Sequence, residues 1–293
     1  MDFLRNHQIY LPAGRWKGGL KMPVITISRQ LGSLGTEIAQ GAAEKLNYEY
    51  VDKKRIEQAL SAYGVLAPEV EKFDEKKPSF WDSFLLQKKR FLHSLEAVVY
   101  DFARNGKVVI VGRGGQVLLQ YLPGVLHVRI IAPFEVRLKR LLAAEGGNEK
   151  KASRILSRSD RDSAGFLRSF FEVDWEDRTL YDLMINTEKL SAETAVKMIV
   201  ASVSSPEIQE GEKKSDAKLA DLALTQKVEV ALMKILGIGF GNVTVLVKGG
   251  VVSLSGQVAS ERLKEDVLRA IKQIEGVTGV NCQFYIYAQY YGP

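Results

Sequence analysis

A chain of 293 residues, 46% of them hydrophobic, is long enough for two folded domains with apolar cores. Its formal net charge of +6 favours anionic partners such as nucleotides, nucleic acid or lipid headgroups, without choosing among them. The single cysteine, Cys282, excludes an intrachain disulfide framework, and the three histidines lack metal-ligand spacing, so no protein-bound metal site is predicted.

Residues 1–21 are predicted to be an extension that precedes the folded part of the chain. Arg, Pro and Gly interrupt this segment, and it contains no apolar run like that of a signal peptide. A start of translation at Met22 fits the pattern as well as a start at Met1. No later segment approaches the ~20 apolar residues of a membrane span, so we expect a cytoplasmic protein.

Residues 22–203 alternate between strand-like and helix-like sequence. Residues 24–28 form a β-branched run, and the turn after them leads into residues 37–46, whose apolar side chains share one helical face. Residues 107–112 and 126–132 are dense in Val and Ile, as parallel strands buried on both faces are. The alternation predicts an α/β fold, a doubly wound parallel sheet with helices on both faces.

Changes in composition mark the rest of the organisation. Residues 53–104 look mainly helical and are predicted to be an insertion between strands. Residues 204–218 are polar, which is typical of a solvated linker. Residues 219–293 then follow a helix, hairpin, helix, strand order, with Gly249 and Gly250 at the hairpin turn. Because no nucleophile, acid pair or metal cluster stands out in this small α+β domain, we interpret it as a binding module.

The turn "RQLGSLGTEIA" after the first strand is a candidate phosphate site. Gly32, Ser33, Gly35 and Thr36 could form a turn whose backbone N–H groups surround phosphate oxygens at a helix N-terminus. The lysine of the G-x-x-x-x-G-K-[ST] pattern is absent. Taken alone, the stretch fits an ordinary tight strand-to-helix connection equally well.

Residues 22–203 as a whole resemble the cytidylate kinase-like family, a branch of the P-loop nucleoside-monophosphate kinases. The resemblance is carried by five segments in order: "ITISRQLGSLGTEIA", "YVDKKRIEQAL", "VVIVGRGGQVLL", "LHVRIIAPFEVRLKRL" and "DWEDRTLYDLMINTEKLSAETAV". Loops in that branch commonly lack the lysine, so its absence here is not by itself decay. The resemblance implies ATP with nucleotide-bound Mg²⁺ as donor and CMP or dCMP as acceptor.

The loop departs from the family pattern in two places. Leu34 stands where the resemblance implies glycine, and its Cβ is expected to obstruct the approach of phosphate. Thr36 stands where the branch often has arginine, and Gly35 falls at the lysine position of the better-known enzymes. Charge must then come from elsewhere, and Arg29 is the nearest candidate; a surface arginine at the strand end is an equally good interpretation.

Two residues are candidates for the acceptor side. Arg113 follows a buried strand and matches the arginine that grips the monophosphate in cytidylate kinases. Its alternative is an arginine paired with a helix acid at the sheet edge. Asp52 matches a family acid that would orient the substrate or a water on Mg²⁺, although an ordinary helix N-cap is slightly favoured.

Residues 153–169 resemble the mobile lid of this kinase class. The candidate contacts to phosphate and substrate in this segment are Arg158, Asp160, Arg161 and Arg168. Ser163 and Gly165 stand where the better-known enzymes carry further arginines, so the clamp is depleted or moved. The alternative, for Arg154 and Arg161 above all, is a solvated helix face.

Residues 219–290 resemble the BON domain, on "VEVALMKIL", "VTVLVKGGVVSLSGQVAS" and "IEGVTGVNCQFYI". This resemblance implies contact with phospholipid or another hydrophobic ligand, and "FYIYAQYYG" supplies aromatic side chains for it. Packing of these aromatics on the domain's own helices is the stronger interpretation. Interleaved acids and the lack of an RNA-reading motif argue against nucleic acid.

The sequence therefore favours an enzyme that transfers phosphate from ATP to a nucleoside monophosphate, with a BON module for localisation or sensing. We expect it in the cytoplasm or at the inner face of a membrane. Two alternatives stay open: a nucleotide-binding regulator without turnover, supported by the lysine-less loop, and a membrane- or stress-associated BON scaffold on an inert α/β domain.

Overall fold

The computed structural model describes residues 23–63, 65 and 81–286. The elements of the larger domain, in chain order, are β1 (Val24–Arg29), α1 (Gly35–Leu46), β2 (Glu49–Val51), α2 (Lys53–Ala62), α4 (Trp81–Asn105), β3 (Val108–Val111), α5 (Gly115–Leu118), β4 (Val125–Ile131), α6 (Phe134–Glu145), α7 (Glu149–Phe171), the 3-10 turn η1 (Arg178–Leu180), β5 (Leu183–Asn186) and α8 (Ala192–Val203). Those that follow are α9 (Pro206–Leu236), the 3-10 turn η2 (Gly237–Asn242), β6 (Val243–Lys248), β7 (Val251–Val258), α10 (Glu261–Lys272) and β8 (Gly279–Ile286).

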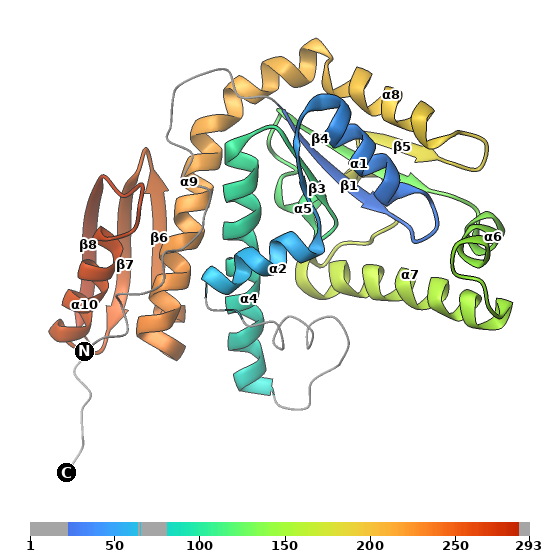
Figure 1. Cartoon of the computed structure of the whole chain (residues 1–293). Helices are drawn as coiled ribbons and strands as arrows, with labels where there is room; N and C mark the ends of the chain where they lie inside the picture. Colours follow the sequence, from blue (N-terminus) through green and yellow to red (C-terminus); the bar gives the residue numbers. More distant parts are fainter. Residues whose placement is uncertain (1–22, 64, 66–80, 287–293) are drawn as a thin grey trace.

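The larger domain is built on a five-stranded parallel sheet in the order β2-β3-β1-β4-β5. Alternate residues of β1 point to opposite faces, as a strand requires. Ile25 and Ile27 pack with the apolar residues of α1 and α8, whereas Thr26 and Ser28 lie on the other face against His127 and Trp175. Helices cover both faces (Figure 1), so the predicted doubly wound α/β fold is confirmed.

The predicted insertion between strands is helical where the structure describes it. Helices α2 and α4 lie between β2 and β3 in the sequence, and α4 packs its buried residues, including Phe91 and Leu95, into the core of the larger domain. The charged middle of this insertion, "PEVEKFDEKKPSF" at 68–80, where two prolines predict a break in the helical sequence, lies outside the described residues.

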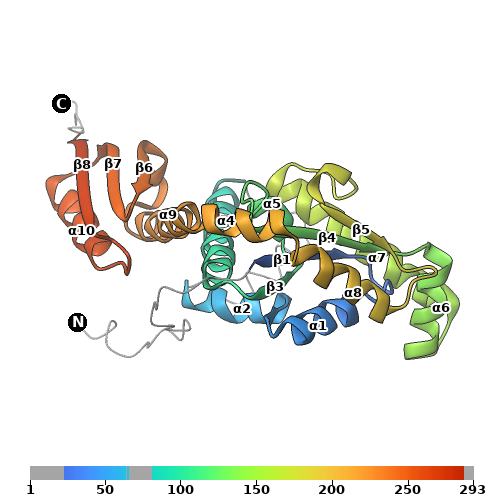
Figure 2. The ribbon, with the colours of Figure 1, turned by 90° about the horizontal axis from the view of Figure 1, so that it is seen from above.

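The prediction of a solvated linker at 204–218 is wrong in its secondary structure. Residues 206–236 form the single helix α9, which lies beside α4 on one side and the small sheet on the other (Figures 1 and 2). Two apolar stripes explain it. The stripe of Leu219, Ala223 and Val230 joins the core of the larger domain, and the stripe of Leu224, Val228 and Leu232 joins the smaller core. At about 100° per residue these stripes lie on opposite faces of the helix, so tertiary contacts on both sides stabilise it.

The smaller domain has the predicted helix, hairpin, helix, strand order, with a three-stranded sheet in the order β6-β7-β8. Strands β6 and β7 are antiparallel and turn at Gly249 (φ 59°) and Gly250 (φ 80°), as a two-residue hairpin with positive φ at both positions requires. The carboxylate of Asp221 in α9 accepts hydrogen bonds from both glycine N–H groups, at 3.0 and 3.3 Å. The hairpin is thereby fastened to the long helix.

No helix within residues 23–63 and 81–286 combines the length and the apolar composition that crossing a membrane demands.

Candidate active site

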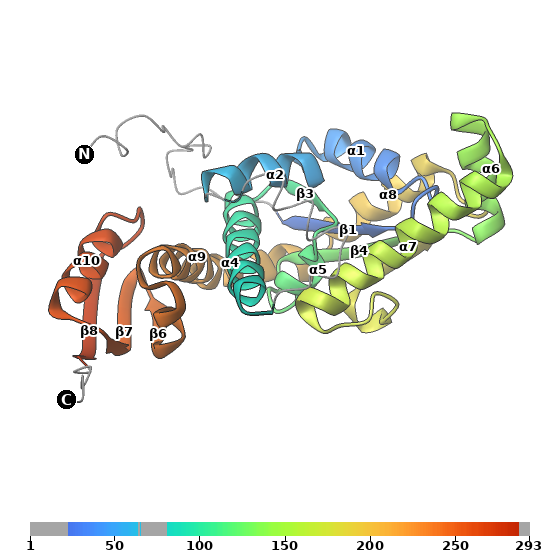
Figure 3. The ribbon, with the colours of Figure 1, turned by 90° about the horizontal axis from the view of Figure 1, so that it is seen from below.

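The candidate residues gather where β1, β3 and β4 end. In a parallel sheet these carboxyl ends share one edge, which is where ligands bind in open α/β folds. Residues 30–34 follow β1, residues 112–114 follow β3, and Ala132 follows β4. Helix α7 crosses this region in Figure 3, in the view from below. The topology thus brings the predicted phosphate loop and the predicted acceptor arginine together.

The backbone carbonyl groups of the predicted phosphate loop accept hydrogen bonds from side chains of other elements. Arg137 of α6 donates to the Leu31 carbonyl at 3.3 Å, and Arg140 donates to the Gly32 carbonyl at 3.3 Å. Arg140 also donates to the carbonyl of Thr187, at 2.7 Å, and the Thr187 hydroxyl donates to the carbonyl of Ser33, at 2.9 Å. Successive carbonyl groups are therefore occupied, and the loop is fixed in one conformation.

The N–H groups of the same loop have no such partners. Among the described residues, none accepts a hydrogen bond from the backbone N–H groups of Leu31, Gly32, Leu34 or Gly35. These donors precede or open α1, whose N-terminal end carries the positive end of the helix dipole. Such a set of free amides is the arrangement that binds phosphate groups.

Leu34 adopts a left-handed conformation, with φ 64° and ψ 11°, directly before α1. Its side chain packs against the apolar cluster that includes Ile38 and Ala42 of α1. The left-handed conformation costs a non-glycine residue about 1–2 kcal/mol, which favourable packing offsets. Leu34, which stands where the resemblance implies glycine, thus adopts a backbone angle that is typical of glycine. Ser33 is buried and donates to the Gln30 carbonyl, at 2.7 Å, whereas Thr36 is exposed.

Arg29 ends β1 beside these amides. Its guanidinium lies near Gly112 of the next loop, since a Cβ added at Gly112 would be 3.5 Å from Nη1 of Arg29. No described residue accepts a hydrogen bond from this guanidinium or forms an ion pair with it. Burial lowers the pKa of Arg29; nearby Arg113 lowers it too, and Tyr50 and Asp52 raise it.

The acceptor-side candidates both have partners within the protein. Arg113, with φ 53°, donates to the carboxylate of Glu57 in α2 at 2.8 Å, and its guanidinium lies 5.3 Å from the ring centroid of Phe166. The structure therefore has the helix-acid pair that was the alternative for this arginine. Asp52 caps α2, because its carboxylate accepts from the N–H of Arg55 at 2.9 Å. The favoured N-cap interpretation is confirmed.

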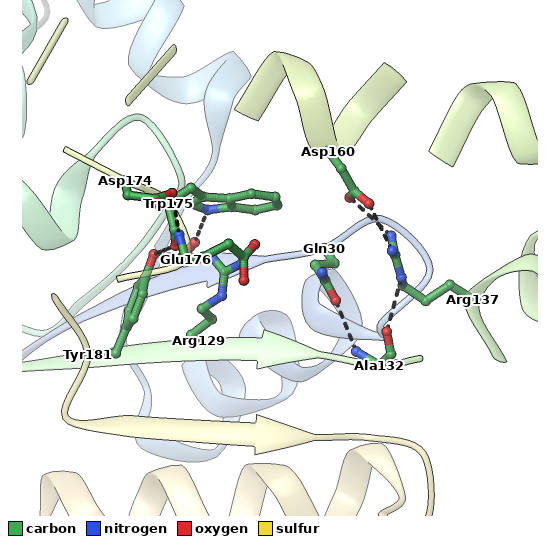
Figure 4. A network of polar contacts seen from close by, with 10 residues as sticks. Gln30, Arg129, Ala132, Arg137, Asp160, Asp174, Trp175, Glu176 and Tyr181 are labelled. Carbon is green, nitrogen blue, oxygen red and sulfur yellow. Dashed lines mark hydrogen bonds and ion pairs between the residues drawn. The ribbon is translucent and has the colours of Figure 1, made fainter. Parts of the chain in front are cut away.

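The predicted lid is the 23-residue helix α7. Asp160 forms two hydrogen bonds with the guanidinium of Arg137, at 3.1 and 2.8 Å, and so ties α7 to the residue that holds the loop (Figure 4). Arg158 lies 3.5 Å from the carboxylate of Asp162 on the exposed side of the helix. Arg161 and Arg168 are also exposed. Asp160 thus lies at the loop, while the three arginines are directed to solvent.

A buried polar network lies on the same edge of the sheet (Figure 4), and sequence reasoning missed it. The side chain of Arg129 in β4 is fully buried and stacks on Trp175, 4.1 Å from the ring centroid. It donates to the hydroxyl of Tyr181 at 3.1 Å and to Glu176 at 2.6 Å. The indole N–H of Trp175 donates to the hydroxyl of Ser28 at 2.8 Å. The segment after α7 is thereby fastened to the two central strands.

Two signals in the sequence could have located three arginines that sequence reasoning missed, Arg129, Arg137 and Arg140. Arg129 lies in a mainly apolar run in a central strand, where a charge must have polar partners. Arg137 and Arg140 are three residues apart, which places them on one face of α6 near the loop. Neither signal names the partners, which come from other parts of the chain.

Comparison with known proteins agrees with this geometry. A model of the cytidylate kinase-like family matches residues 24–189, more than half of the 293 residues. The chain belongs to the cytidylate kinase-like family. A cytidylate kinase of Natronomonas pharaonis is 26% identical over 198 residues, which are 64% of this chain and 94% of that protein. A cytidylate kinase of Methanocorpusculum labreanum is 27% identical over 189 residues, 62% of this chain and 96% of that protein.

Among solved structures, an uncharacterized protein from Eubacterium ventriosum shares the fold of this cytidylate kinase-like domain. Its TM-score is 0.50 at 22% sequence identity, over 63% of this chain and 99% of that one.

The smaller domain matches a model of the BON domain over residues 220–286. Of the aromatic segment "FYIYAQYYG", residues 284–286 are described and the rest lie outside the described residues. Phe284 packs against the domain's own core, whereas Tyr285 is 72% exposed. Leu246 of β6 is also exposed, at 65%.

Proposed function

We propose that this protein transfers a phosphoryl group from ATP to a nucleoside monophosphate, with CMP or dCMP as the acceptor. The observation that carries the proposal is the loop at 29–36, with backbone donors free and carbonyl groups occupied, beside an arginine that has no ion-pair partner among the described residues. Phosphoryl transfer requires little covalent chemistry from the protein beyond positioning and cationic stabilisation. Family membership supports the reaction class, and the names of the relatives support the base.

The residues present fit a nucleotide donor. The free amides of Leu31, Gly32, Leu34 and Gly35 would hold phosphate oxygens, and the helix dipole of α1 would add to their effect. Within the described part of the chain, no cluster of three or more His, Cys, Asp or Glu is arranged to hold a metal ion. Mg²⁺ would accordingly be bound through the phosphates, where it neutralises charge.

Arg113 would bind the monophosphate. Its present partner is the carboxylate of Glu57, whose side chain is 30% exposed, and a doubly charged phosphate is a stronger acceptor for a guanidinium. Arg158, Arg161 and Arg168 of α7 would approach only when the lid closes, because they face solvent in this structure. Asp160 would act through Arg137 by holding the loop and lid together.

The proposal is tested on the full-length chain, because α9 buries apolar residues in both domains. We expect CMP-dependent release of ADP from Mg-ATP in a coupled assay. Arg113→Ala should lower kcat/KM for CMP by about 10²-fold, as expected for the loss of a phosphate-binding cation. Arg269→Ala, at an exposed ion pair of α10, is the matched control and should be unchanged. Equal activity of the Arg113 variant and the control would refute the role of Arg113.

A second candidate is a nucleotide-binding regulator without turnover. The observations that favour it are the pairing of Arg113 with Glu57 and the absence of arginine at Ser163 and Gly165 of the lid. Calorimetric titration with Mg-ATP and CMP separates the two functions. Binding without ADP release would establish the regulator, and release would exclude it.

For the BON domain we propose contact with a phospholipid surface, which would hold the kinase in the cytoplasm at the inner face of a membrane. The exposed side chains of Tyr285 and Leu246 support contact with an apolar phase, although Ser, Asn and Gln also occupy the outer positions of β7 and β8. Co-sedimentation of the full-length chain with anionic vesicles tests this. Recovery of the protein in the pellet, and its loss in Tyr285→Ser, is the expected result; equal recovery without vesicles would refute it.

A further inference from the structure

We infer that Arg29, at the end of β1, replaces the lysine of an ordinary P-loop as the cation on the transferred phosphoryl group. The inference rests on the proposed function and assigns a catalytic residue to it. Three features of the structure support the inference. They are the space that a side chain at position 35 would need, the position of the Arg29 guanidinium, and the charges around that guanidinium.

The first feature is that Arg29 occupies the space that a side chain at position 35 would need. A Cβ added at Gly35 would lie 2.4 Å from the Cβ of Arg29 and 2.8 Å from its Cγ. Atoms of this kind do not approach so closely, so any larger residue at position 35 would displace residue 29. The contact at Cβ would arise with any residue except glycine at position 29, and the contact at Cγ adds the long side chain of Arg29 to it. Residue 35 therefore has no room for a side chain in this arrangement, and Arg29 brings a cation past the place where the stem of a lysine would begin.

The second feature is the position of the Arg29 guanidinium. Its stem crosses Gly35, at the start of α1, and its guanidinium reaches Gly112, at the end of β3. Gly112 begins the loop that carries Arg113. The guanidinium thus lies between the loop predicted to hold the donor phosphates and the loop predicted to hold the acceptor. This is the position from which a cation can contact a group that moves from one to the other.

The third feature is that the protein does not neutralise this charge. No described residue forms an ion pair with Arg29; the charges that act on it are the like charge of Arg113 and the carboxylate of Asp52, which caps α2. Arg113 is paired with Glu57, whereas Arg29 has no ion-pair partner among the described residues, and an unpaired charge in a partly buried place is unfavourable. A phosphate beside Arg29 would supply the missing anion.

In the reaction, Arg29 would stabilise charge without exchanging a proton. The bond between the γ-phosphorus and its bridging oxygen breaks, and a bond forms to an oxygen of the monophosphate. The guanidinium would stabilise the negative charge on the equatorial oxygens of the transferred phosphoryl group, and it stays protonated throughout. A guanidinium can contact two of these oxygens together, whereas an ammonium contacts them as a point charge.

An exchange of the two cations tests the inference in full-length protein with Mg-ATP and CMP. Arg29→Ala should lower kcat by about 10²-fold or more, with a smaller effect on KM. Gly35→Lys should lower both activity and the melting temperature, since Arg29 obstructs the new side chain. The double variant Arg29→Gly with Gly35→Lys removes the Cβ that the new side chain would meet, so it should regain at least about tenfold over Arg29→Ala and melt above Gly35→Lys. Arg55→Ala, at an exposed ion pair of α2, is the control.

The outcomes separate this inference from the proposed function. If the wild type turns over CMP but Arg29→Ala keeps the kcat of the control, the inference is wrong and the kinase assignment stands. Failure of the double variant to exceed Arg29→Ala would also overturn it. If the wild type binds Mg-ATP without turnover, the affinity of the same variants is compared, and loss in Arg29→Ala with recovery in the double variant supports the inference. If the wild type neither turns over nor binds nucleotide, both fail.

Discussion

The contact between α4 and α9 predicts that the stability of this protein depends on pH through His93. The ring of His93 lies 2.8 Å from the carboxylate of Glu229 and 3.4 Å from that of Glu96, with the amide oxygen of Gln226 at 2.7 Å and the ring of Phe240 edge-on. Burial disfavours the charged ring, but Glu229, Glu96 and Gln226 outweigh burial and raise the pKa of His93 to about 10. His93 is therefore charged at neutral pH.

The sign of the effect follows from the two end states. Below the unfolded pKa of 6.5, His93 is protonated whether the chain is folded or not, and the stabilisation is fully present. As the pH rises towards about 10, the unfolded chain has lost the proton and the folded chain gives it up, so the stabilisation is lost. At about 1.4 kcal/mol per pKa unit the upper limit is near 5 kcal/mol. Because the side chain is 21% exposed, we expect about 2–3 kcal/mol.

The measurement is urea unfolding of the wild type and of His93→Gln between pH 6 and pH 10. Glutamine keeps a donor but cannot carry the charge. The difference in unfolding free energy between the two proteins should fall by about 2–3 kcal/mol across this range. Burial first, and then Glu96 and Glu229, raise the pKa of neighbouring Tyr100, but both proteins carry this tyrosine, so the pH dependence that it adds cancels in the difference. A difference that stays constant with pH would refute the reasoning.

Two further pairs of variants test the packing and the cap. Gly211→Ala should lower the melting temperature by several degrees, because the added Cβ would lie 2.1 Å from the Pro123 carbonyl oxygen. Gly165→Ala, whose added Cβ would have nothing within 4 Å, should raise the unfolding free energy by about 0.5–1 kcal/mol. Equal melting temperatures of the two variants would contradict this. Asp52→Ala should cost about 1 kcal/mol whereas Asp52→Asn keeps the cap; a large loss of kcat in Asp52→Asn with unchanged unfolding would mean that the carboxylate also serves the substrate.

Local features of the sequence determined a large part of this protein. The β-branched runs predict parallel strands because burial on both faces requires continuous apolar sequence, as in β3, where all four residues are buried. Gly249 and Gly250 predict the hairpin because the turn needs positive φ at both residues. The cap at Asp52 depends on a residue three positions away. Motif order placed the phosphate loop at 29–36, and the catalytic roles of its residues remain predictions.

The tertiary structure alone decided the features that depend on partners far along the chain. Residues 204–218 look like a linker because polar side chains are numerous, but the apolar stripes that continue α9 have their partners in two different cores. The loop carbonyls are held by Arg137, Arg140 and Thr187, more than a hundred residues later. Arg29 meets Gly112 across the sheet because β1 and β3 are paired in parallel. Pattern and propensity report the neighbours of a residue in sequence, whereas charge and space at this site are set by neighbours in the fold.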